Sequence, residues 1–333
     1  MATRVAMRAL SFAEAAADYE ETVGLPISRM TVWRAATAAG QVLSAEKARE
    51  AEQAGRPVQR GEDPSQPRVA QDSPIAEQAN ISSDGVMIRL RDEGWKEAKI
   101  ATISRVQVLS PKGTRPGERP GRRDFDPRVK LDEHSYVAGV WDADQFGRYQ
   151  YAEGLRRGLD TVETLTSVND GAPWIARVTG TNWPEAQQIL DWPHAVGHVY
   201  DVAKVIWGEG STAGTQWAQA RVDELWSGDV EDVLQALSEL HLERYDWPED
   251  QANPRGYFEE NIDRMRYDLF RDAGYPIGSG TVESEASHVV QSRLRRPGRG
   301  WRRDNANGML ALLAEYHSGR FNKVWQLVCK TRP

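Results

Sequence analysis

Three acidic residues that lie far apart in the sequence, Asp84, Asp170 and Glu283, could together support metal-dependent chemistry. Asp84 ends a first stretch with the composition of a strand, and Asp170 directly follows another such stretch. Glu283 falls in the first turn of a helix that apolar spacing predicts from about position 281. Strand ends and helix starts can meet at one edge of a mixed sheet, where ligands commonly bind. Carboxylates that meet there repel each other. Two Mg²⁺ or Mn²⁺ ions would remove this repulsion, activate water or a 3′-hydroxyl, and stabilise the leaving oxygen.

Each of these residues also has a plain structural explanation. Asp84-Gly85 is a common hairpin-turn pair, and Asn-Asp-Gly at 169–171 is a common turn. Taken singly, both sequences favour a turn over a catalytic site. A carboxylate at 283 would also be favoured by the helix dipole alone. The order of the three residues and the elements around them are more specific than any one residue. Glu285 lies about 200° further around the same helix, so it is not expected to share the site.

Arginines are concentrated directly after this predicted helix, and no acidic residue separates them. One interpretation is a solvated basic loop. A sharper interpretation is that the guanidinium groups hold phosphate beside a carboxylate site. The residues are Arg293, Arg295, Arg296, Arg299, Arg302 and Arg303. A second arginine-rich stretch, 110–130, is also rich in proline and glycine, which predicts a loop.

Composition limits the possible classes of protein. The 333 residues suffice for one large core or two smaller ones. No apolar run could span a membrane, and the first residues lack the apolar region of a signal peptide, so we expect a cytoplasmic protein with no membrane partner. Cys329 is the only cysteine, which excludes intrachain disulfides and cysteine-based zinc sites. The net charge of −7 has the wrong sign for a simple nucleic-acid binder, but binding depends on local charge.

The order of predicted elements is that of a ribonuclease-H-like α/β domain with a mixed sheet. Three strands come first, then a helix, then alternating strands and helices, and a long helical stretch precedes the last part of the core. A short strand segment at 79–84 is predicted to lead into a second segment at 85–90, and further strands are predicted at 96–109, 134–141, 162–168 and 187–191. Helices are predicted at 143–159 and 194–206. From 207 to about 273 the pattern is helical throughout.

The N-terminal residues 9–55 are predicted to form three helices. Ser11 and Glu14 have the spacing of a capping box, and Ser28 can cap the helix that follows the Gly-Leu-Pro break at 24–26. Helix, short turn, helix is the pattern of a DNA-binding helix-turn-helix, although an ordinary helical hairpin fits equally well. The residues predicted on the exposed face are Met30, Trp33 and Arg34, with Arg29 at its flank.

Four stretches of the chain resemble insertion-sequence DDE transposases of the Kra type. They are SSDGVMIRLRDEGWKEAKIATI at 82–103, VNDGAPWI at 168–175, ILDWPHA at 189–195 and GYPIGSGTVESEASHVVQSRLRRPGRGW at 274–301. The resemblance covers most of residues 80–320, and its last stretch is the most specific. It implies that Asp84, Asp170 and Glu283 form a catalytic triad that binds two Mg²⁺ or Mn²⁺ ions on a ribonuclease-H-like core. It also favours the helix-turn-helix interpretation of residues 9–40 over an ordinary helical hairpin.

The resemblance implies an enzyme that cleaves DNA and transfers strands, with terminal inverted repeats and target DNA as partners. It would act as a homo-oligomer on DNA, close to the bacterial nucleoid. The implied segments are a helix-turn-helix-like 1–55, a linker at 56–77, the first part of the core at 78–208, a helical insertion at 209–273, the last core helix with the basic loop at 274–303, and C-terminal helices at 304–333. Two alternatives remain open: a ribonuclease-H-like nuclease without strand transfer, and an inactive or truncated copy that regulates by binding DNA.

An Asp-x-x-His pair, Asp191 and His194, follows the second aspartate. Several DDE transposases with helical insertions have a similar pair at this place. The simpler interpretation is that Asp191 caps the next helix and that His194 is a satisfied interior histidine. We therefore expect a structural or DNA-positioning role for the pair in preference to direct metal ligation.

Overall fold

A computed structural model describes residues 1–55, 69–110, 128–248, 253–280, 286–296 and 300–330. The side chains of residues 286 and 287 are not described either. Most of the predicted linker and most of the predicted loop at 110–130 lie outside these ranges. No helix in the described part of the chain combines the length and the apolar character that a membrane span requires.

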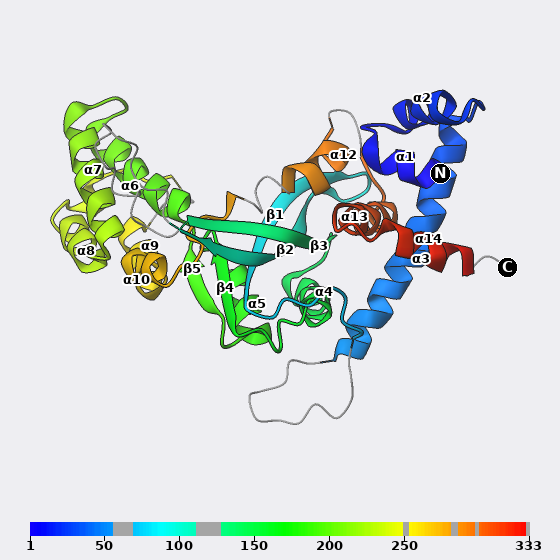
Figure 1. Cartoon of the computed structure of the whole chain (residues 1–333). Helices are drawn as coiled ribbons and strands as arrows, with labels where there is room; N and C mark the ends of the chain where they lie inside the picture. Colours follow the sequence, from blue (N-terminus) through cyan, green and yellow to red (C-terminus); the bar gives the residue numbers. More distant parts are fainter. Residues whose placement is uncertain (56–68, 111–127, 249–252, 281–285, 297–299, 331–333) are drawn as a thin grey trace, which may run out of the picture.

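A mixed five-stranded sheet forms the centre of the molecule (Figure 1). Its strands are β1 (Gln78–Leu90), β2 (Gly94–Leu109), β3 (Arg128–Gly139), β4 (Thr164–Asn169) and β5 (Gln187–Leu190). The order is β3-β2-β1-β4-β5, with antiparallel pairing among β1, β2 and β3 and parallel pairing of β1 with β4 and of β4 with β5. The fold is therefore α/β, and the sheet is compatible with the predicted ribonuclease-H-like arrangement. The prediction that the strands carrying Asp84 and preceding Asp170 are neighbours is confirmed.

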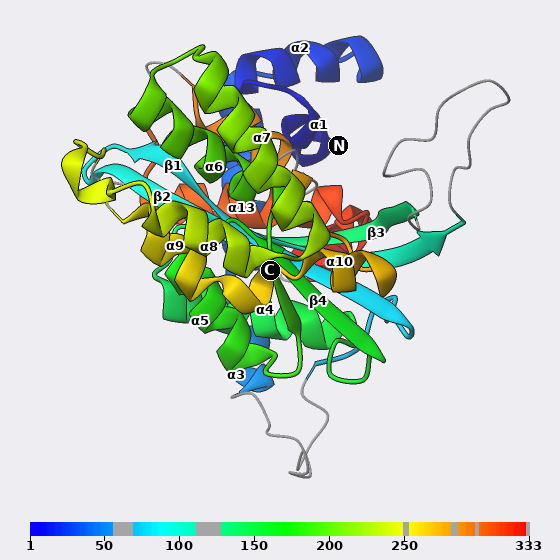
Figure 2. The same ribbon diagram turned by 90° about the vertical axis from the view of Figure 1, so that its left-hand side faces the viewer.

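Helices α4 (Ala143–Arg156) and α5 (Pro173–Asn182) cover one face of the sheet (Figure 2). Alternate residues of β1 point to this face, so Ile81 packs with Tyr151 and Leu155 of this layer. The sequence pattern does not predict α5. Its second half, Val-Thr-Gly-Thr-Asn, has weak intrinsic helix propensity. The burial of Ile175 and Val178 stabilises the helix in place of propensity.

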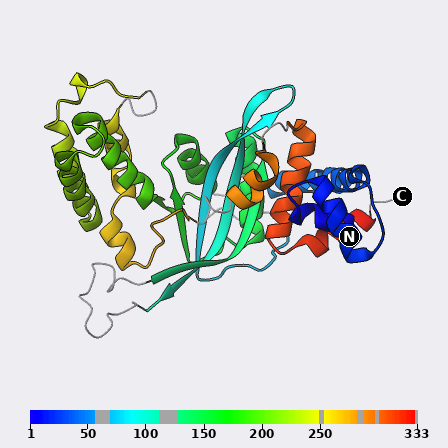
Figure 3. The same cartoon turned by 90° about the horizontal axis from the view of Figure 1, so that it is seen from above.

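The opposite face of the sheet is covered by the two ends of the chain. Val86, Ile88 and Leu90 of β1 are buried there in one core with residues from both chain ends. The covering elements are α1 (Ala2–Arg8), α2 (Phe12–Val23), α3 (Arg29–Ala54), the π-helical turn Ala286–Gln291, α12 (Ser292–Leu294), α13 (Arg303–His317) and α14 (Phe321–Lys330). Figure 3 shows the blue and red helices on this side of the strands.

A block of helices follows β5 and lies at the other end of the molecule in Figure 3. It contains α6 (Trp192–Trp207), α7 (Thr212–Ser227), α8 (Val230–Ser238), α9 (Pro254–Glu260), α10 (Tyr267–Asp272) and the 3₁₀ turns Leu242–Arg244 and Ile262–Arg264. These elements share a core with Val168 of β4 and with Ile189 and Leu190 of β5. The described residues of 209–273 contain helices and turns but no strand, as predicted.

The caps predicted for α2 and α3 are present. The Ser11 hydroxyl accepts a hydrogen bond from the Glu14 amide (3.0 Å), Gly24 ends α2 in the left-handed conformation (φ 74°), and the Ser28 hydroxyl accepts from the Thr31 amide (3.1 Å). The expectation of three helices within 9–55 is wrong, because this range holds only α2 and one 26-residue helix, α3. Gly40 lies inside α3, at the place where α3 crosses α13.

Gly40 permits the close approach of α3 and α13, so we expect Gly40→Ala to destabilise the fold. A Cβ at position 40 would lie 2.8 Å from the backbone carbonyl of Gly308, closer than such atoms can approach. Overpacking of this kind costs about 1–3 kcal/mol, offset by up to ~1 kcal/mol of helix propensity. Urea denaturation measures the net change. Gly197→Ala is the control, because that glycine lies in α6 with open space around it and should gain stability from propensity alone.

Candidate functional site

Asp84 lies inside β1 and not at its end. Its register partner is Ile100 of β2, and the β1–β2 pairing continues to Leu90 and Gly94. The prediction that a strand segment ends at Asp84 is therefore wrong, as is the alternative of a hairpin turn at Asp84-Gly85. The cause is the apolar alternation after Asp84, whose buried side chains keep the hairpin against the helices at the chain ends.

Asp170 follows the last residue of β4 and lies level with Asp84 in the sheet. The pairing of β1 with β4 runs from Gln78–Thr164 to Asn80–Thr166. The offset of 86 residues that relates these pairs also relates Asp84 to Asp170. A hydrogen bond supports the extended register, because the Ser83 amide donates to the Asn169 side chain at 2.7 Å. Extending the register in this way places Asp84 and Asp170 at the same level of two neighbouring parallel strands.

Both aspartates are fixed locally by backbone groups. Oδ1 of Asp84 accepts a hydrogen bond from the Gly85 amide (2.6 Å), and Oδ1 of Asp170 accepts from the Ala172 amide (3.0 Å). Gly171 adopts a positive φ of 88°, so the predicted Asn-Asp-Gly turn is present as well. A turn and a functional carboxylate are compatible at this position, because the turn orients the side chain.

Asp191 directly follows the next strand, β5, at the same level as Asp170, since Asn169 pairs with Leu190. Its carboxylate is fully buried, caps α6 by accepting from the His194 amide (3.1 Å), and lies 2.7 Å from His194 Nδ1. The Ser279 amide also donates to it. Burial alone would raise the pKa of Asp191, but these hydrogen bonds lower it below the usual range. The helix-cap interpretation is confirmed, whereas His194 is 39% exposed and is not an interior histidine.

Glu283 and Glu285 lie outside the described residues. The described flank before them contacts the end of β5, because Trp192 N donates to the Ile277 carbonyl (2.8 Å) and Ser279 bonds to Asp191. After them, Val289 and Val290 are buried in the core that also holds Val86 of β1.

Asp84 and Asp170 offer the hard carboxylate oxygens that Mg²⁺ and Mn²⁺ prefer, on neighbouring strands of the sheet. Within the described ranges, no three aspartate, glutamate, histidine or cysteine side chains converge as a complete metal site. A third ligand would have to come from elsewhere.

The arginines after residue 292 differ in their availability to a ligand. Arg293 is buried: its Nη1 donates to the Ala9 carbonyl (2.9 Å) and its guanidinium carbon lies 4.2 Å from the centre of the Phe12 ring. The prediction that Arg293 contacts DNA is therefore wrong, because the residue fastens the N-terminal helices to the core. Arg303 binds both carboxylate oxygens of Glu93.

The remaining predicted DNA contacts have side chains that reach the surface, with one residue not described. Arg295 and Arg302 are exposed, Arg296 is half-buried, and Arg299 lies outside the described residues. Arg29 and Arg34 at the start of α3 are exposed, as the helix-turn-helix pattern predicts.

Tyr257 of α9 is a residue near the site that the sequence does not reveal. Its ring stacks on His198 at a centroid distance of 3.7 Å, and its hydroxyl lies 3.6 Å from the place a Cβ on Gly171 would take. In the described part of the chain this buried hydroxyl has no hydrogen-bond partner. Burial, together with the charges of Asp170 and Asp191, raises the pKa of Tyr257 well above its ordinary value.

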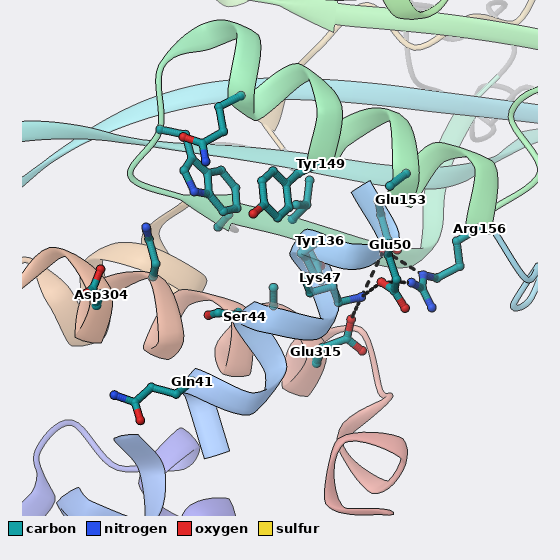
Figure 4. A pocket seen from close by; sticks show the side chains of 18 residues that line it. Gln41, Ser44, Lys47, Glu50, Tyr136, Tyr149, Glu153, Arg156, Asp304 and Glu315 are labelled. Carbon is teal, nitrogen blue, oxygen red and sulfur yellow. Dashed lines mark hydrogen bonds and ion pairs between the residues drawn. The ribbon is translucent and has the colours of Figure 1, made fainter. Parts of the chain in front are cut away.

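A cavity of about 360 Å³ lies among β3, α3, α4 and α13 (Figure 4). One end is lined by a cluster of buried and half-buried ion pairs between Lys47, Glu50, Glu153, Arg156 and Glu315. β3 is the edge strand on the far side of β1 from β4 and β5. The cavity is therefore separate from Asp84 and Asp170, and its two cations are already paired with carboxylates.

No protein-family model and no curated protein matches this chain.

Proposed function

We propose that the chain is a metal-dependent DDE transposase that cleaves DNA at the ends of an insertion sequence and joins the freed 3′-hydroxyls to target DNA. The observation that carries the proposal is the placement of Asp84 on β1 and of Asp170 directly after β4, two neighbouring parallel strands whose preceding residues, Ser83 and Asn169, are hydrogen-bonded to each other. The resemblance of 82–103, 168–175, 189–195 and 274–301 to the Kra-type family supports the same conclusion.

In this proposal Asp84, Asp170 and Glu283 hold Mg²⁺ or Mn²⁺. Such ions polarise phosphate oxygens and activate water or a 3′-hydroxyl. Asp191 anchors the segment before Glu283 through Ser279 and orients His194, which suits positioning better than ligation. The helices after β5 correspond to an insertion in a ribonuclease-H-like core, and α2 and α3 to an end-binding helix-turn-helix. The acting form is a homo-oligomer on DNA in the bacterial cytoplasm.

A plasmid assay tests the proposal. The substrate is a supercoiled plasmid that carries the gene with its flanking DNA, incubated with the protein in Mg²⁺, in Mn²⁺, or in excess EDTA. We expect cleavage at the borders of the element, strand joining to a second plasmid, and no reaction in EDTA. Cleavage without joining would favour the nuclease alternative, and specific binding without cleavage would favour the regulatory one.

Arg295 and Arg296 are expected to bind phosphate and not bases. Each phosphate contact contributes about −0.9 to the slope of log K against log salt on duplex DNA, so Arg295→Ala with Arg296→Ala should flatten the slope by roughly 2. Binding to flanking and scrambled duplexes should weaken about equally, as titrations at several salt concentrations would measure. Arg29→Ala with Arg34→Ala is the contrasting variant, which should instead reduce the preference for the flanking sequence. An unchanged slope in the first variant would mean that its arginines form only a solvated surface.

A further inference from the structure

A chain of buried polar side chains lies behind the two aspartates, on the face of the sheet that α4 and α5 cover. Ser83 and Asp84 point to opposite faces because side chains alternate along a strand. The members of this chain are Ser83 of β1, Gln150 of α4, Ser167 and Asn169 of β4, and Thr179 and Asn182 of α5. None is more than 8% exposed. Such a polar group within an apolar layer is costly unless all its members are hydrogen-bonded.

The central bond of the chain joins the residues that immediately precede Asp84 and Asp170. The Ser83 amide donates to Oδ1 of Asn169 at 2.7 Å. The paired register of β1 with β4 ends earlier, at Asn80 and Thr166. The Asn169 side chain thus takes the place of a backbone partner for a buried amide that would otherwise be orphaned. It acts as a strut between the two strands at the level where the carboxylates emerge.

Further hydrogen bonds hold the strut in one orientation. Nδ2 of Asn169 donates to Ser167 Oγ at 2.8 Å, so both ends of its amide are used. Gln150 Nε2 donates to Ser83 Oγ at 3.1 Å, and Asn182 Nδ2 donates to Gln150 Oε1 at 2.9 Å and to the Gly147 carbonyl at 2.8 Å. Two helices therefore fix the strand separation through side chains, and not by apolar packing alone.

We propose that Asn169 is a positioning residue that sets the spacing of Asp84 and Asp170 and thereby the affinity of the site for a divalent ion, with Gln150 as its support. The inference rests on the proposed function. Groups that orient metal ligands typically contribute 10- to 100-fold to metal affinity. Loss of the strut frees the Ser83 amide and lets the two strands separate where both ligands are attached.

The test measures Mn²⁺ binding to the full chain without DNA, by calorimetry, together with the Mn²⁺ concentration that gives half-maximal plasmid cleavage. Asn169→Leu keeps the side-chain size but removes the bond to Ser83. We expect its Kd for Mn²⁺ to rise about 10- to 100-fold, with cleavage restored at saturating Mn²⁺. Should this variant not fold, Gln150→Ala and Ser83→Ala weaken the support alone and should raise Kd by a smaller factor.

Thr166→Val is the matched control. The Thr166 hydroxyl is equally buried between the same two strands and bonds to Asn80 Oδ1 (3.0 Å) and the Ala79 carbonyl (3.2 Å), but it lies away from the aspartates. The Thr166→Val variant should unfold at lower urea concentration, but its Kd for Mn²⁺ should be unchanged. If Asn169→Leu also loses only stability and binds Mn²⁺ as the wild type does, the positioning role is overturned and the proposed function stands. If the wild type itself binds no Mn²⁺, the proposed function fails and this inference with it.

Discussion

Asp84→Asn and Asp170→Asn should each abolish metal-dependent cleavage of the plasmid while the protein stays folded and binds DNA. Each substitution removes the negative charge of one proposed metal ligand and keeps its size. Metal ions supply several kcal/mol of transition-state stabilisation, so we expect a loss of about 10³-fold or more in rate. Gel-based cleavage assays in Mg²⁺ and Mn²⁺ measure the loss, with DNA binding and thermal unfolding recorded in parallel.

Asp160→Asn is the control for these variants. Asp160 is exposed and lies before the start of β4, at the opposite end of the strand from Asp170. This variant should retain wild-type activity. On the family resemblance, Glu283→Gln should fail like the aspartate variants and Glu285→Gln should remain active. Activity in Asp84→Asn or Asp170→Asn would show that the paired carboxylates are structural.

Arg320→Leu should destabilise the fold by about 3–5 kcal/mol, because it leaves two buried carboxylates without their main partner. The guanidinium of Arg320 is 9% exposed and donates to Glu153 at 2.8 and 3.2 Å and to Glu315 at 2.8 and 3.0 Å. Lys47 contacts Glu315 at 2.5 Å and extends the cluster to α3. The cluster therefore fixes the long helix that carries the proposed DNA-binding residues. Urea denaturation at pH 7 measures the loss.

The pH dependence of this effect distinguishes ion pairing from packing. Burial would raise the pKa of Glu315, but the charges of Lys47 and Arg320 hold it well below its usual range. A carboxylate whose pKa is lowered in the folded state stabilises the fold at pH values above its unfolded-state pKa, which is about 4.3 for glutamate. This contribution to the free energy of unfolding is lost as the pH falls towards the lowered pKa. The stability gap between wild type and Arg320→Leu should therefore shrink below about pH 4. Arg255→Leu, which breaks the exposed pair with Glu259, should change little at any pH. A gap that is independent of pH would mean that Arg320 acts mainly through packing.

The parts of the fold set by local pattern could be predicted from the sequence. The five strands, α4, α6 and the caps at Ser11 and Ser28 follow from apolar periodicity and capping chemistry. The place of Asp84 in its strand could not be judged in this way, because the strand continues on account of helices from both chain ends that pack on it. The role of Arg293 could not be predicted for a similar reason, because its partner Ala9 lies 284 residues away in the sequence.

The strand order at the candidate site could be predicted from the sequence, but the side-chain contacts around it could not. The neighbouring placement of Asp84 and Asp170 follows from strand order, which the element sequence suggests. The strut at Asn169 and the buried Tyr257 hydroxyl depend on side-chain contacts between distant elements, so no local signal identifies them. The polar residue directly before each aspartate is the one feature of the sequence that could have drawn attention to Ser83 and Asn169.

The central claim is that Asp84 and Asp170 jointly hold a divalent ion. The most direct measurement is anomalous diffraction from crystals of the protein soaked in MnCl₂, recorded at the manganese absorption edge. We predict at least one anomalous peak in coordinating contact with a carboxylate oxygen of both residues, and any second peak about 3.5–4 Å from the first. Well-ordered Asp84 and Asp170 side chains with no peak between them, at Mn²⁺ concentrations that support cleavage, would contradict the claim.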